Sequence, residues 1–466
     1  AYVRGRDAAA LRMAERTLTK MARGGMHDQL GGGFHRYSVD AHWLVPHFEK
    51  MLYDNAQLAL SYVHAFQLTG KAFYRQIAEE TLDYIRREMT SPEGGFYSTQ
   101  DADSEGEEGK FFLWTPSQVE AVLGQADARL FCRYFDVTPS GNFEGKNILH
   151  VPRDPDVVAE QLGLDERELE TAVERGRQKV LAAREKRIHP GRDEKVLTAW
   201  NGLMLKAFAE ASAALSRPDY GETAAASAAF LLRELRRDGK LLRTYKDGQS
   251  KLNGYLEDYA DLVDGLLALY QVSFDLPWFT AARELAEVMI EQFWSEDDEC
   301  FYDTGRGHEQ LINRPRDTFD NATPSGNSVA VDVLLQLWLL TGEQRFSAIA
   351  ETVLGGMQRL AGSYPLGFGR LLCAYDRYFG PAPEIALVGG LDSPEMANLR
   401  QAVWARFVPG KVVAGCAPGD AETESAVPLL AGRAPVDGHP AAYVCHSFAC
   451  EMPITEPAKL AEKLAG

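Results

Sequence analysis

Cysteine and long apolar runs are the features that this chain of 466 residues has least of. Its six cysteines are spread too thinly for the dense disulfide framework of a small secreted protein. The longest apolar run, residues 329–340, is interrupted by Asp332 and Gln336 and is shorter than the roughly 18 residues that a membrane-spanning helix needs. We therefore expect no transmembrane helix, and we favour a reducing, cytoplasmic location.

Positive charge is also scarce. Lys and Arg number 49 against 67 Asp and Glu, which leaves a net charge of −18. Such a surface repels nucleic-acid phosphates and anionic membranes, and no basic run interleaved with aromatic residues is present, so we expect neither as a partner. The first residues lack an initiator Met and the apolar segment of a signal peptide, and we expect the chain to be part of a longer one.

What the sequence does contain is a repeated unit of an apolar helix, a short turn, an amphipathic helix and a loop rich in glycine and aromatic residues. The predicted helix pairs are 50–68 with 72–89, 196–215 with 219–236, 255–274 with 278–294, and 325–340 with 344–360. Helix 7–22 is predicted to be the second half of a first unit, and segment 115–190 a decorated unit with helices near 116–135 and 165–186.

This repetition predicts hairpins that bury their faces only by stacking on one another. The first helix of each pair is apolar nearly all round and the second is amphipathic, which is typical of an inner and an outer ring of helices. The fold class expected is therefore all-α, an (α/α)6 toroid over residues 1–380 whose loops form a funnel. Residues 381–466 are predicted to form a small α/β appendix, with strands at 384–389, 411–414 and 442–445 and a helix at 393–405.

The densest polar cluster is near the N-terminus. Its members are His27, Asp28, His35, Arg36, His42, His47, Glu49, Lys50, Tyr53, Asp54 and Asn55. His47, Lys50 and Asp54 are expected to fall on one helical face, at i, i+3 and i+7, as acid and base groups at a funnel mouth would. The alternative is that these side chains only tie loop carbonyls together. A metal site is not expected, because the spacing does not match His-Glu-x-x-His.

A second cluster, residues 100–109, contains five acids, including Asp101 and Asp103. It lacks the spacing of a calcium-binding loop, so solvated turn acids or acids that bind sugar hydroxyls are the better interpretations.

Polar residues also open three predicted inner helices. They are Trp200 and Asn201, then Glu257, Asp258 and Tyr259, then Asp320 and Asn327. Aromatic rings beside amides and carboxylates suit stacking on sugar faces and hydrogen bonding to hydroxyls. Helix capping is the alternative for Glu257 and Asp258. Cys445 and Cys450 do not have Cys-x-x-Cys spacing, so structural thiols are expected there.

Several stretches resemble the thioredoxin-domain-containing, spermatogenesis-associated protein family. They are 31–38 (GGGFHRYS), 43–55 (WLVPHFEKMLYDN), 101–106 (DADSEG), 200–204 (WNGLM), 256–260 (LEDYA), 322–328 (ATPSGNS) and 443–445 (YVC). This resemblance implies a six-hairpin barrel similar to those of glycosidases and N-acylglucosamine 2-epimerases, preceded by a thioredoxin-like domain that this chain lacks. The resemblance implies a fold more firmly than a reaction.

These observations lead to a carbohydrate-active protein that binds a neutral sugar or polyol without a cofactor or metal. A sugar epimerase or isomerase would use His47 with His27 or His35 as its two bases, and a glycoside hydrolase would use Glu257 or Asp258 opposite Asp54, Asp101 or Asp320. The residues expected to bind substrate are Arg36, Tyr53, Asn55, Asp101, Asp103, Trp200, Asn201, Tyr259, Asp320 and Asn327. The alternatives are a non-catalytic module that works with a thioredoxin-like domain, or a redox protein that acts through Cys445 and Cys450.

Overall fold

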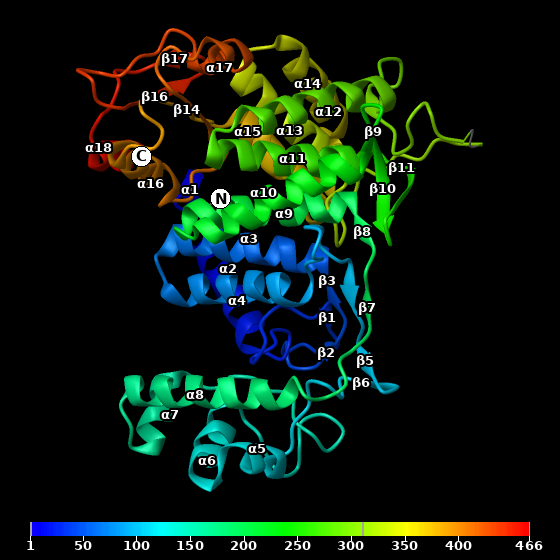
Figure 1. Ribbon diagram of the computed structural model, residues 1–466, viewed down its shortest axis with the longest axis vertical. Helices are drawn as coiled ribbons and strands as arrows, with labels where there is room; N and C mark the ends of the chain where they lie inside the picture. Colours follow the sequence, from blue (N-terminus) through cyan, green and yellow to red (C-terminus); the bar gives the residue numbers. More distant parts are fainter. Residues whose placement is uncertain (1, 310–311, 466) are drawn as a thin grey trace. The chain divides into compact units, whose positions relative to one another are not determined.

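The computed structural model describes residues 2–309 and 312–465, and most of its regular structure is helical (Figure 1). The chain divides into two compact units. Unit 1 comprises Ala1–Tyr62, Gln76–Thr90 and Tyr97–Glu194. Unit 2 comprises Val63–Arg75, Ser91–Phe96 and Lys195–Gly466. The part of the chain predicted to be helical contributes to both units, and the C-terminal appendix lies within unit 2.

Unit 2 contains three complete helical hairpins in succession. Their helices are α9 (Thr198–Ala214), α10 (Pro218–Glu234), α11 (Leu256–Ser273), α12 (Leu276–Phe293), α13 (Gly326–Thr341) and α14 (Gln344–Ser363). Nearly every residue of α11 and α13 is buried, whereas α10, α12 and α14 bury one side only. The buried helices pack side by side in the order α9, α11, α13, α15, where α15 is Gly369–Phe379. This is the inner and outer arrangement that was predicted, and the fold class of an (α/α)6 toroid with an α/β appendix is confirmed.

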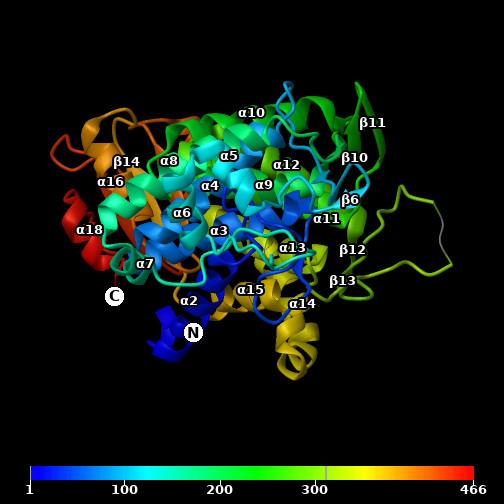
Figure 2. The ribbon, with the colours of Figure 1, turned by 90° about the horizontal axis from the view of Figure 1, so that it is seen from below.

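Strands of unit 2 lie at the starts of the inner helices (Figures 1 and 2). They are β8 (Val196–Leu197), β9 (Arg236–Arg237), β10 (Lys240–Lys246), β11 (Gln249–Asn253), β12 (Trp294–Ser295) and β13 (Cys300–Phe301). Strand β10 pairs with β11 and with β8, which leads directly into α9. The loop ends of the hairpins are therefore held together by short sheets.

Unit 1 contains the start of α3 (Leu52–Thr69), most of α4 (Ala72–Glu88) and the decorated segment (Figure 1). Its other helices are α1 (Tyr2–Gly5), α2 (Ala8–Arg23), α5 (Pro116–Leu123), α6 (Gln125–Tyr134), α7 (Pro155–Leu162) and α8 (Glu166–Arg184). Its strands are β1 (Tyr37–Ser38), β2 (Pro46–His47), β3 (Lys50–Met51), β4 (Thr99–Gln100), β5 (Asp103–Ser104), β6 (Glu107–Glu108) and β7 (Arg192–Asp193). Helices α5, α6 and α8 enclose an apolar cluster around Phe131 and Val180.

In several hairpins, a side chain in the first turn of the inner helix forms hydrogen bonds with the backbone of the preceding glycine–aromatic loop. The Asn55 amide accepts a hydrogen bond from the Phe34 backbone N–H (2.7 Å) and donates one to the Phe34 carbonyl (3.0 Å). Asn201 holds Phe96 in the same way (2.8 and 3.0 Å), and Asn327 holds Phe301 (3.3 and 3.2 Å). In α11 the Tyr259 hydroxyl replaces the amide and accepts the Leu241 N–H (2.8 Å).

The appendix has the strands that the sequence predicts. Strand β14 (Glu384–Val388) lies between β15 (Val412–Cys416), which is parallel to it, and β16 (Ala441–His446), which is antiparallel and pairs with β17 (Ala449–Cys450). The remaining elements are η1 (Pro365–Gly367), α16 (Pro394–Trp404), α17 (Ala421–Ala426), η2 (Pro428–Leu430) and α18 (Pro457–Lys463). Cys445 and Cys450 form a disulfide across β16 and β17, so the expectation of structural thiols is wrong.

Three further expectations are corrected. Helix α3 begins at Leu52, so His47 in β2 and Lys50 in β3 do not share a helical face with Asp54. Residues 369–379 form a helix that we did not predict, and so do residues 155–162.

Among the described residues, no helix combines the length and the apolar character required to cross a membrane.

Candidate functional site

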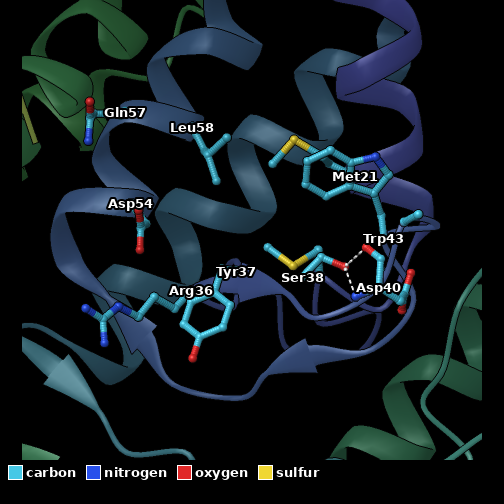
Figure 3. Close-up of a pocket in the computed structure, with 11 residues that line it drawn as sticks. Met21, Arg36, Tyr37, Ser38, Asp40, Trp43, Asp54, Gln57 and Leu58 are labelled. Atoms are coloured by element: carbon cyan, nitrogen blue, oxygen red, sulfur yellow. Dashed lines mark hydrogen bonds between the residues drawn. The ribbon is translucent and has the colours of Figure 1, made fainter. Parts of the chain in front are cut away.

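A cavity of about 510 Å³ opens in unit 1 beside the start of α3 (Figure 3). Helix α3 contributes Asp54, Gln57 and Leu58 to its wall, and α2 contributes Met21. The loop from β1 to β2 contributes the rest: Arg36, Tyr37, Ser38, Asp40, Ala41 and Trp43, with Met26 from the preceding segment. The cavity therefore combines two aromatic rings and an apolar side with a small number of polar groups, which is typical of small-molecule sites.

The loop wall of this cavity is fixed by Asp40. Its carboxylate accepts hydrogen bonds from the backbone N–H groups of His42 (2.5 Å), Leu44 (3.4 Å) and Val45 (2.5 Å). These bonds enclose Trp43, whose φ of 64° lies in the left-handed region that a bulky residue rarely adopts. Asp40 thus holds the Trp43 ring in the wall in spite of that backbone cost.

Asp54 is the most unusual titratable group in the cavity. Its Oδ2 atom is buried and has no hydrogen-bond partner among the described residues. Burial raises the pKa of Asp54 to about 7; Arg36 opposes this shift and Glu49 adds to it. Near neutral pH, a large share of this carboxyl is therefore protonated and can donate a proton into the cavity.

A chain of charged side chains runs from Arg36 away from Asp54. Arg36 Nη1 donates to Glu49 Oε2 (2.9 Å), and His47 Nε2 lies 3.6 Å from the same oxygen. On the other edge of the ring, His47 Nδ1 is 2.7 Å from Glu108 Oε1. A carboxylate on Nδ1 fixes the orientation of an imidazole, as in other acid–base sites.

Two contacts connect this chain with the cavity. The ring of His47 stacks on that of Tyr37, which lines the cavity, with centroids 5.1 Å apart. Arg36 also donates to the hydroxyl of Tyr53, which is buried next to Asp54 on α3. The sequence-predicted residues that the structure brings together are thus Arg36, His47, Tyr53 and Asp54.

The other two predicted catalytic histidines are buried. The exposed fractions of His27 and His35 are 1% and 2%. Burial lowers the pKa of His27 to about 4 and that of His35 to about 3, so both rings are neutral near pH 7. His35 Nδ1 also bonds the Phe48 carbonyl (2.8 Å). Neither ring can contact a ligand in this structure, so we propose no catalytic role for either of them.

The predicted ligand amides have structural partners instead. Each of Asn55, Asn201 and Asn327 donates a second hydrogen bond to a backbone carbonyl, at 2.8, 2.9 and 3.0 Å. Since both amide hydrogens are occupied in all three, none is left for a sugar hydroxyl. The hydroxyl of Tyr259 is likewise engaged with a backbone N–H, as described above.

Two predicted carboxylates of unit 2 also hold backbone. Asp258 accepts from the N–H groups of Ala199 (3.0 Å) and Tyr255 (2.9 Å), and burial raises its pKa to about 7 against the opposing charge of Arg243. Asp320 accepts from Ser325 and from Arg370 and Leu371 at the start of α15. The capping interpretation offered for Asp258 therefore describes that residue, and Asp320 caps the start of α15, a role that the sequence did not predict for it.

The remaining predicted residues lie outside the cavity. Glu257 is half-exposed and paired with Arg243 (2.8 Å), and Trp200 is half-buried in the first turn of α9. Asp101 and Asp103 are exposed at the β5–β6 hairpin. The predicted catalytic role of Glu257 and the predicted substrate-binding roles of Trp200, Asp101 and Asp103 stay predictions.

Sequence reasoning placed Glu49 and Glu108 in polar clusters but gave neither a role. Glu108 belongs to the acidic segment 100–109, and it meets His47 because β5 and β6 form a hairpin. Residues 46–50 alternate between buried and half-exposed, as an extended segment does, but the buried Lys50 hides this alternation from the sequence.

Unit 2 has a second group of buried charges. Asp264, Asp332, Lys206, Arg370 and Arg377 are ion-paired in it, whereas Oδ1 of the neighbouring Asp261 has no hydrogen-bond partner among the described residues, and burial raises the pKa of Asp261 well above its ordinary value. Asp332 on α13, 1% exposed, accepts from Arg370 Nη2 and Arg377 Nε, both at 2.7 Å. Arg370 Nη2 also contacts Asp264 (2.7 Å), which is paired with Lys206 (2.9 Å). Burial alone would raise the pKa of Asp332, but the two guanidinium groups hold it well below its ordinary value.

Within residues 2–309 and 312–465, no three His, Cys, Asp or Glu side chains are grouped so that they could hold a metal ion.

No model of a known protein family matches the chain. Spermatogenesis-associated protein 20 of Homo sapiens is 34% identical to it over 98% of this chain and 63% of its own length. An uncharacterised Caenorhabditis elegans protein, B0495.5, is 27% identical over 97% of this chain and 66% of its own length. The chain therefore spans less than two thirds of these relatives, and the upstream thioredoxin-like domain stays a prediction.

Two of the similar solved structures are a sugar epimerase from a ruminal bacterium and the unsaturated glucuronyl hydrolase of Bacillus sp. GL1. The epimerase has a TM-score of 0.46 and 9% identity, with 75% of this chain and 72% of the other covered. The hydrolase has a TM-score of 0.42 and 15% identity, with 72% and 70% covered. We draw no conclusion about the reaction from likenesses this distant.

Proposed function

We propose that this chain, which belongs to the family of spermatogenesis-associated protein 20, binds a neutral sugar or polyol in the cavity beside Asp54 and transfers a proton on it. The observation that carries the proposal is the half-buried carboxyl of Asp54 in a cavity walled by Tyr37 and Trp43: its Oδ2 has no hydrogen-bond partner among the described residues, and its pKa is raised to about 7. No other described cavity combines such a group with stacking rings.

The lining supports a sugar as the ligand. The rings of Tyr37 and Trp43 suit packing on the C–H faces of sugar rings, and Gln57 adds a polar side chain to the wall. The volume of about 510 Å³ is within the range, roughly 300–1,000 Å³, of small-molecule sites. Arg36, the cation in the wall, is already neutralised by Glu49, so the cavity does not require an anionic ligand.

The proton transfer that this arrangement supports best is isomerisation or epimerisation at a carbon next to a carbonyl. Asp54 would donate a proton to the carbonyl oxygen. His47 does not itself line the cavity, but it stacks on the cavity residue Tyr37 and is oriented by Glu108, which makes it the candidate base for the proton on carbon. This replaces the pair of histidines first considered, because His27 and His35 are buried.

A glycosidic bond is the second candidate. The charge of Glu49 acts on Asp54, so the two carboxyls are near enough to interact, and a pair of carboxyls is what glycoside hydrolysis requires. In that reaction, Asp54 would protonate the leaving oxygen.

The test uses a panel of aldoses, ketoses and disaccharides in D2O, followed by NMR. Deuterium entering at the carbon next to the carbonyl indicates isomerase or epimerase chemistry, and new reducing ends indicate hydrolysis. With the active sugar, we expect Asp54→Asn to lower turnover by roughly 100-fold or more, because it removes the acid. His47→Gln should also lower turnover, whereas Asp156→Asn, an exposed carboxyl on α7, should leave it unchanged.

Wild-type turnover should fall as the pH rises through about 7, because Asp54 then loses its proton. Binding of a sugar without turnover would favour the non-catalytic module instead. Absence of binding across the panel by isothermal titration, or full turnover in Asp54→Asn, would refute the proposal.

A further inference from the structure

The Cys445–Cys450 disulfide joins two strands at the edge of the appendix sheet. Cys445 in β16 lies directly opposite Cys450 in β17. Cys445 is fully buried, whereas Cys450 is exposed. A thiolate from solution can therefore reach one sulfur and not the other.

A guanidinium group lies against both sulfurs. Arg433 Nη2 is 2.8 Å from Cys450 Sγ and 3.4 Å from Cys445 Sγ. Its Nη1 donates to the Ala431 carbonyl (3.1 Å), and its Nε is buried with no acceptor among the described residues. The titratable groups that face it are Glu384 on β14 and Tyr443 on β16.

The positive charge of Arg433 has no ion-pairing carboxylate in the described part of the chain. The nearby carboxylate, Glu384, accepts instead from the backbone N–H of Phe448 (3.1 and 3.3 Å). A disulfide sulfur is a weak acceptor, whereas a thiolate is a full negative charge. The surroundings of these two sulfurs therefore suit a thiolate better than the disulfide that occupies them.

The turn between the two strands also favours breaking the disulfide. Ser447 and Phe448 have φ values of 50° and 66°, which a tight hairpin requires and which glycine or asparagine adopt more easily. The disulfide closes this turn one residue pair away. Breaking the disulfide releases a backbone conformation that these residues do not favour.

We propose that Cys445 and Cys450 form a dithiol–disulfide exchange site, with Cys450 as the attacked sulfur and Arg433 as the group that stabilises the departing thiolate. The co-reactant is a dithiol. Its first thiolate attacks Cys450 Sγ, the S–S bond breaks, and the electron pair leaves on Cys445 Sγ beside Arg433.

In the second step, the other thiolate of the dithiol attacks its partner sulfur in the mixed disulfide, and the electron pair leaves on Cys450 Sγ. The dithiol becomes a cyclic disulfide and loses two electrons, which the two cysteines gain. Its two protons pass to the cysteine sulfurs, except where Arg433 keeps a sulfur as the thiolate. Because a leaving group of lower pKa departs faster, Arg433 accelerates reduction.

The test uses the whole chain with dithiothreitol as the dithiol, and mass spectrometry to count alkylated cysteines after a quench. Oxidised protein should show four alkylated thiols, Cys132, Cys300, Cys373 and Cys416, and reduced protein should show six. We expect reduction of Arg433→Gln to be about tenfold slower than that of wild type. Arg433→Lys should recover part of the rate, and Arg359→Gln, an exposed arginine on α14, should match wild type.

A second measurement does not depend on the fold of a variant. In reduced wild type, iodoacetamide should alkylate Cys450 at lower pH than in the same protein unfolded in guanidinium chloride, where Arg433 is no longer adjacent. Equal reduction rates in wild type and Arg433→Gln, equal alkylation profiles, or two cysteines that resist dithiothreitol in the native protein would each overturn the proposal.

Discussion

Asp54 and Asp332 are both carboxyls on inner helices, α3 and α13, yet their surroundings drive their pKa values in opposite directions. Asp332 is held between Arg370 and Arg377 and stays ionised. Asp54 keeps an oxygen without a partner, and its pKa is raised to about 7. Burial acts against the charged form at both positions, so the presence of partners decides the outcome.

The comparison separates a structural acid from a candidate catalytic acid. Buried carboxylates that are ion-paired, such as Asp264 and Asp332, contribute to the fold and have nothing left for a ligand. Asp261 beside them keeps an oxygen without a partner, but it is only 2% exposed and so offers no opening to a ligand. A carboxyl that is nearly buried, unpaired and open to a cavity has a proton to donate near neutral pH.

The largest expected effect is a loss of stability when Asp332, the ion-paired carboxyl, is replaced. Asp332→Asn leaves Arg370 and Arg377 facing a neutral amide inside the fold, which should lower the free energy of unfolding at pH 7 by about 3–5 kcal/mol. Urea unfolding measures this, with the exposed Asp392→Asn as the control. Because the pKa of Asp332 is depressed, the loss should shrink as the pH falls below its ordinary value. A loss below 1 kcal/mol would show that the ion group is not structural.

The loop-fastening amides should come next. Asn201→Ala leaves the Phe96 N–H and C=O and the Leu197 carbonyl unpaired inside the fold, at an expected cost of about 2–4 kcal/mol. Asn321→Ala, an exposed amide in the loop before α13, should cost less than about 0.5 kcal/mol. If sugar binding were lost in Asn201→Ala while stability was unchanged, the predicted ligand role would be restored.

Asp54→Asn should raise the free energy of unfolding rather than lower it. The native protein binds a proton at Asp54 between pH 3.8 and about 7 that the unfolded chain does not, so wild-type stability falls as the pH rises through this window. The variant avoids the loss and should be more stable at pH 8 by about 2–4 kcal/mol, with no difference below pH 4. The upper value corresponds to about 1.4 kcal/mol for each pKa unit between 3.8 and about 7, and the lower value allows for the partial exposure of the side chain. Thermal unfolding at several pH values measures the difference. A variant less stable than wild type at pH 8 would mean that Asp54 is a paired, structural acid.

The smallest effect on stability is expected for His47→Gln. The ring is half-exposed, and its bond to Glu108 is near the surface, so the free energy of unfolding should change by less than about 1 kcal/mol. If turnover falls while stability does not, the role of His47 is chemical. A large loss of stability would instead make it a strut between β2 and β6.

The helical repeat could be predicted from hydrophobic periodicity and from recurring turns. Helix α13 is apolar on nearly all sides, and a Thr-Gly turn follows both α3 and α13. The fastening amides carried a signal too, since Asn55, Asn201 and Asn327 occupy matching places in their units. Without coordinates, however, an amide that binds backbone cannot be told from one that binds sugar.

The site was predicted only in part. Arg36, His47 and Asp54 were in the right cluster, but the burial of His27 and His35 depends on packing against rings such as Phe34 and Phe112, which no local pattern reveals. The pairing of His47 with Glu108 joins residues 61 positions apart, and such contacts are set by tertiary structure.

The bond between Asn201 and Phe96 also has a consequence for how this chain could have grown. It closes a loop of 105 residues, and within unit 1 the ends of that excursion meet again where Ser98 donates to the Asp193 carbonyl. A loop clamped at its base can lengthen with only a slow rise in closure entropy. A lineage could therefore lengthen the chain between Phe96 and Lys195 at low entropic cost, but it could not exchange α8 freely, because Arg184 pairs with the buried Asp28 and Arg177 pairs with Glu80 of α4.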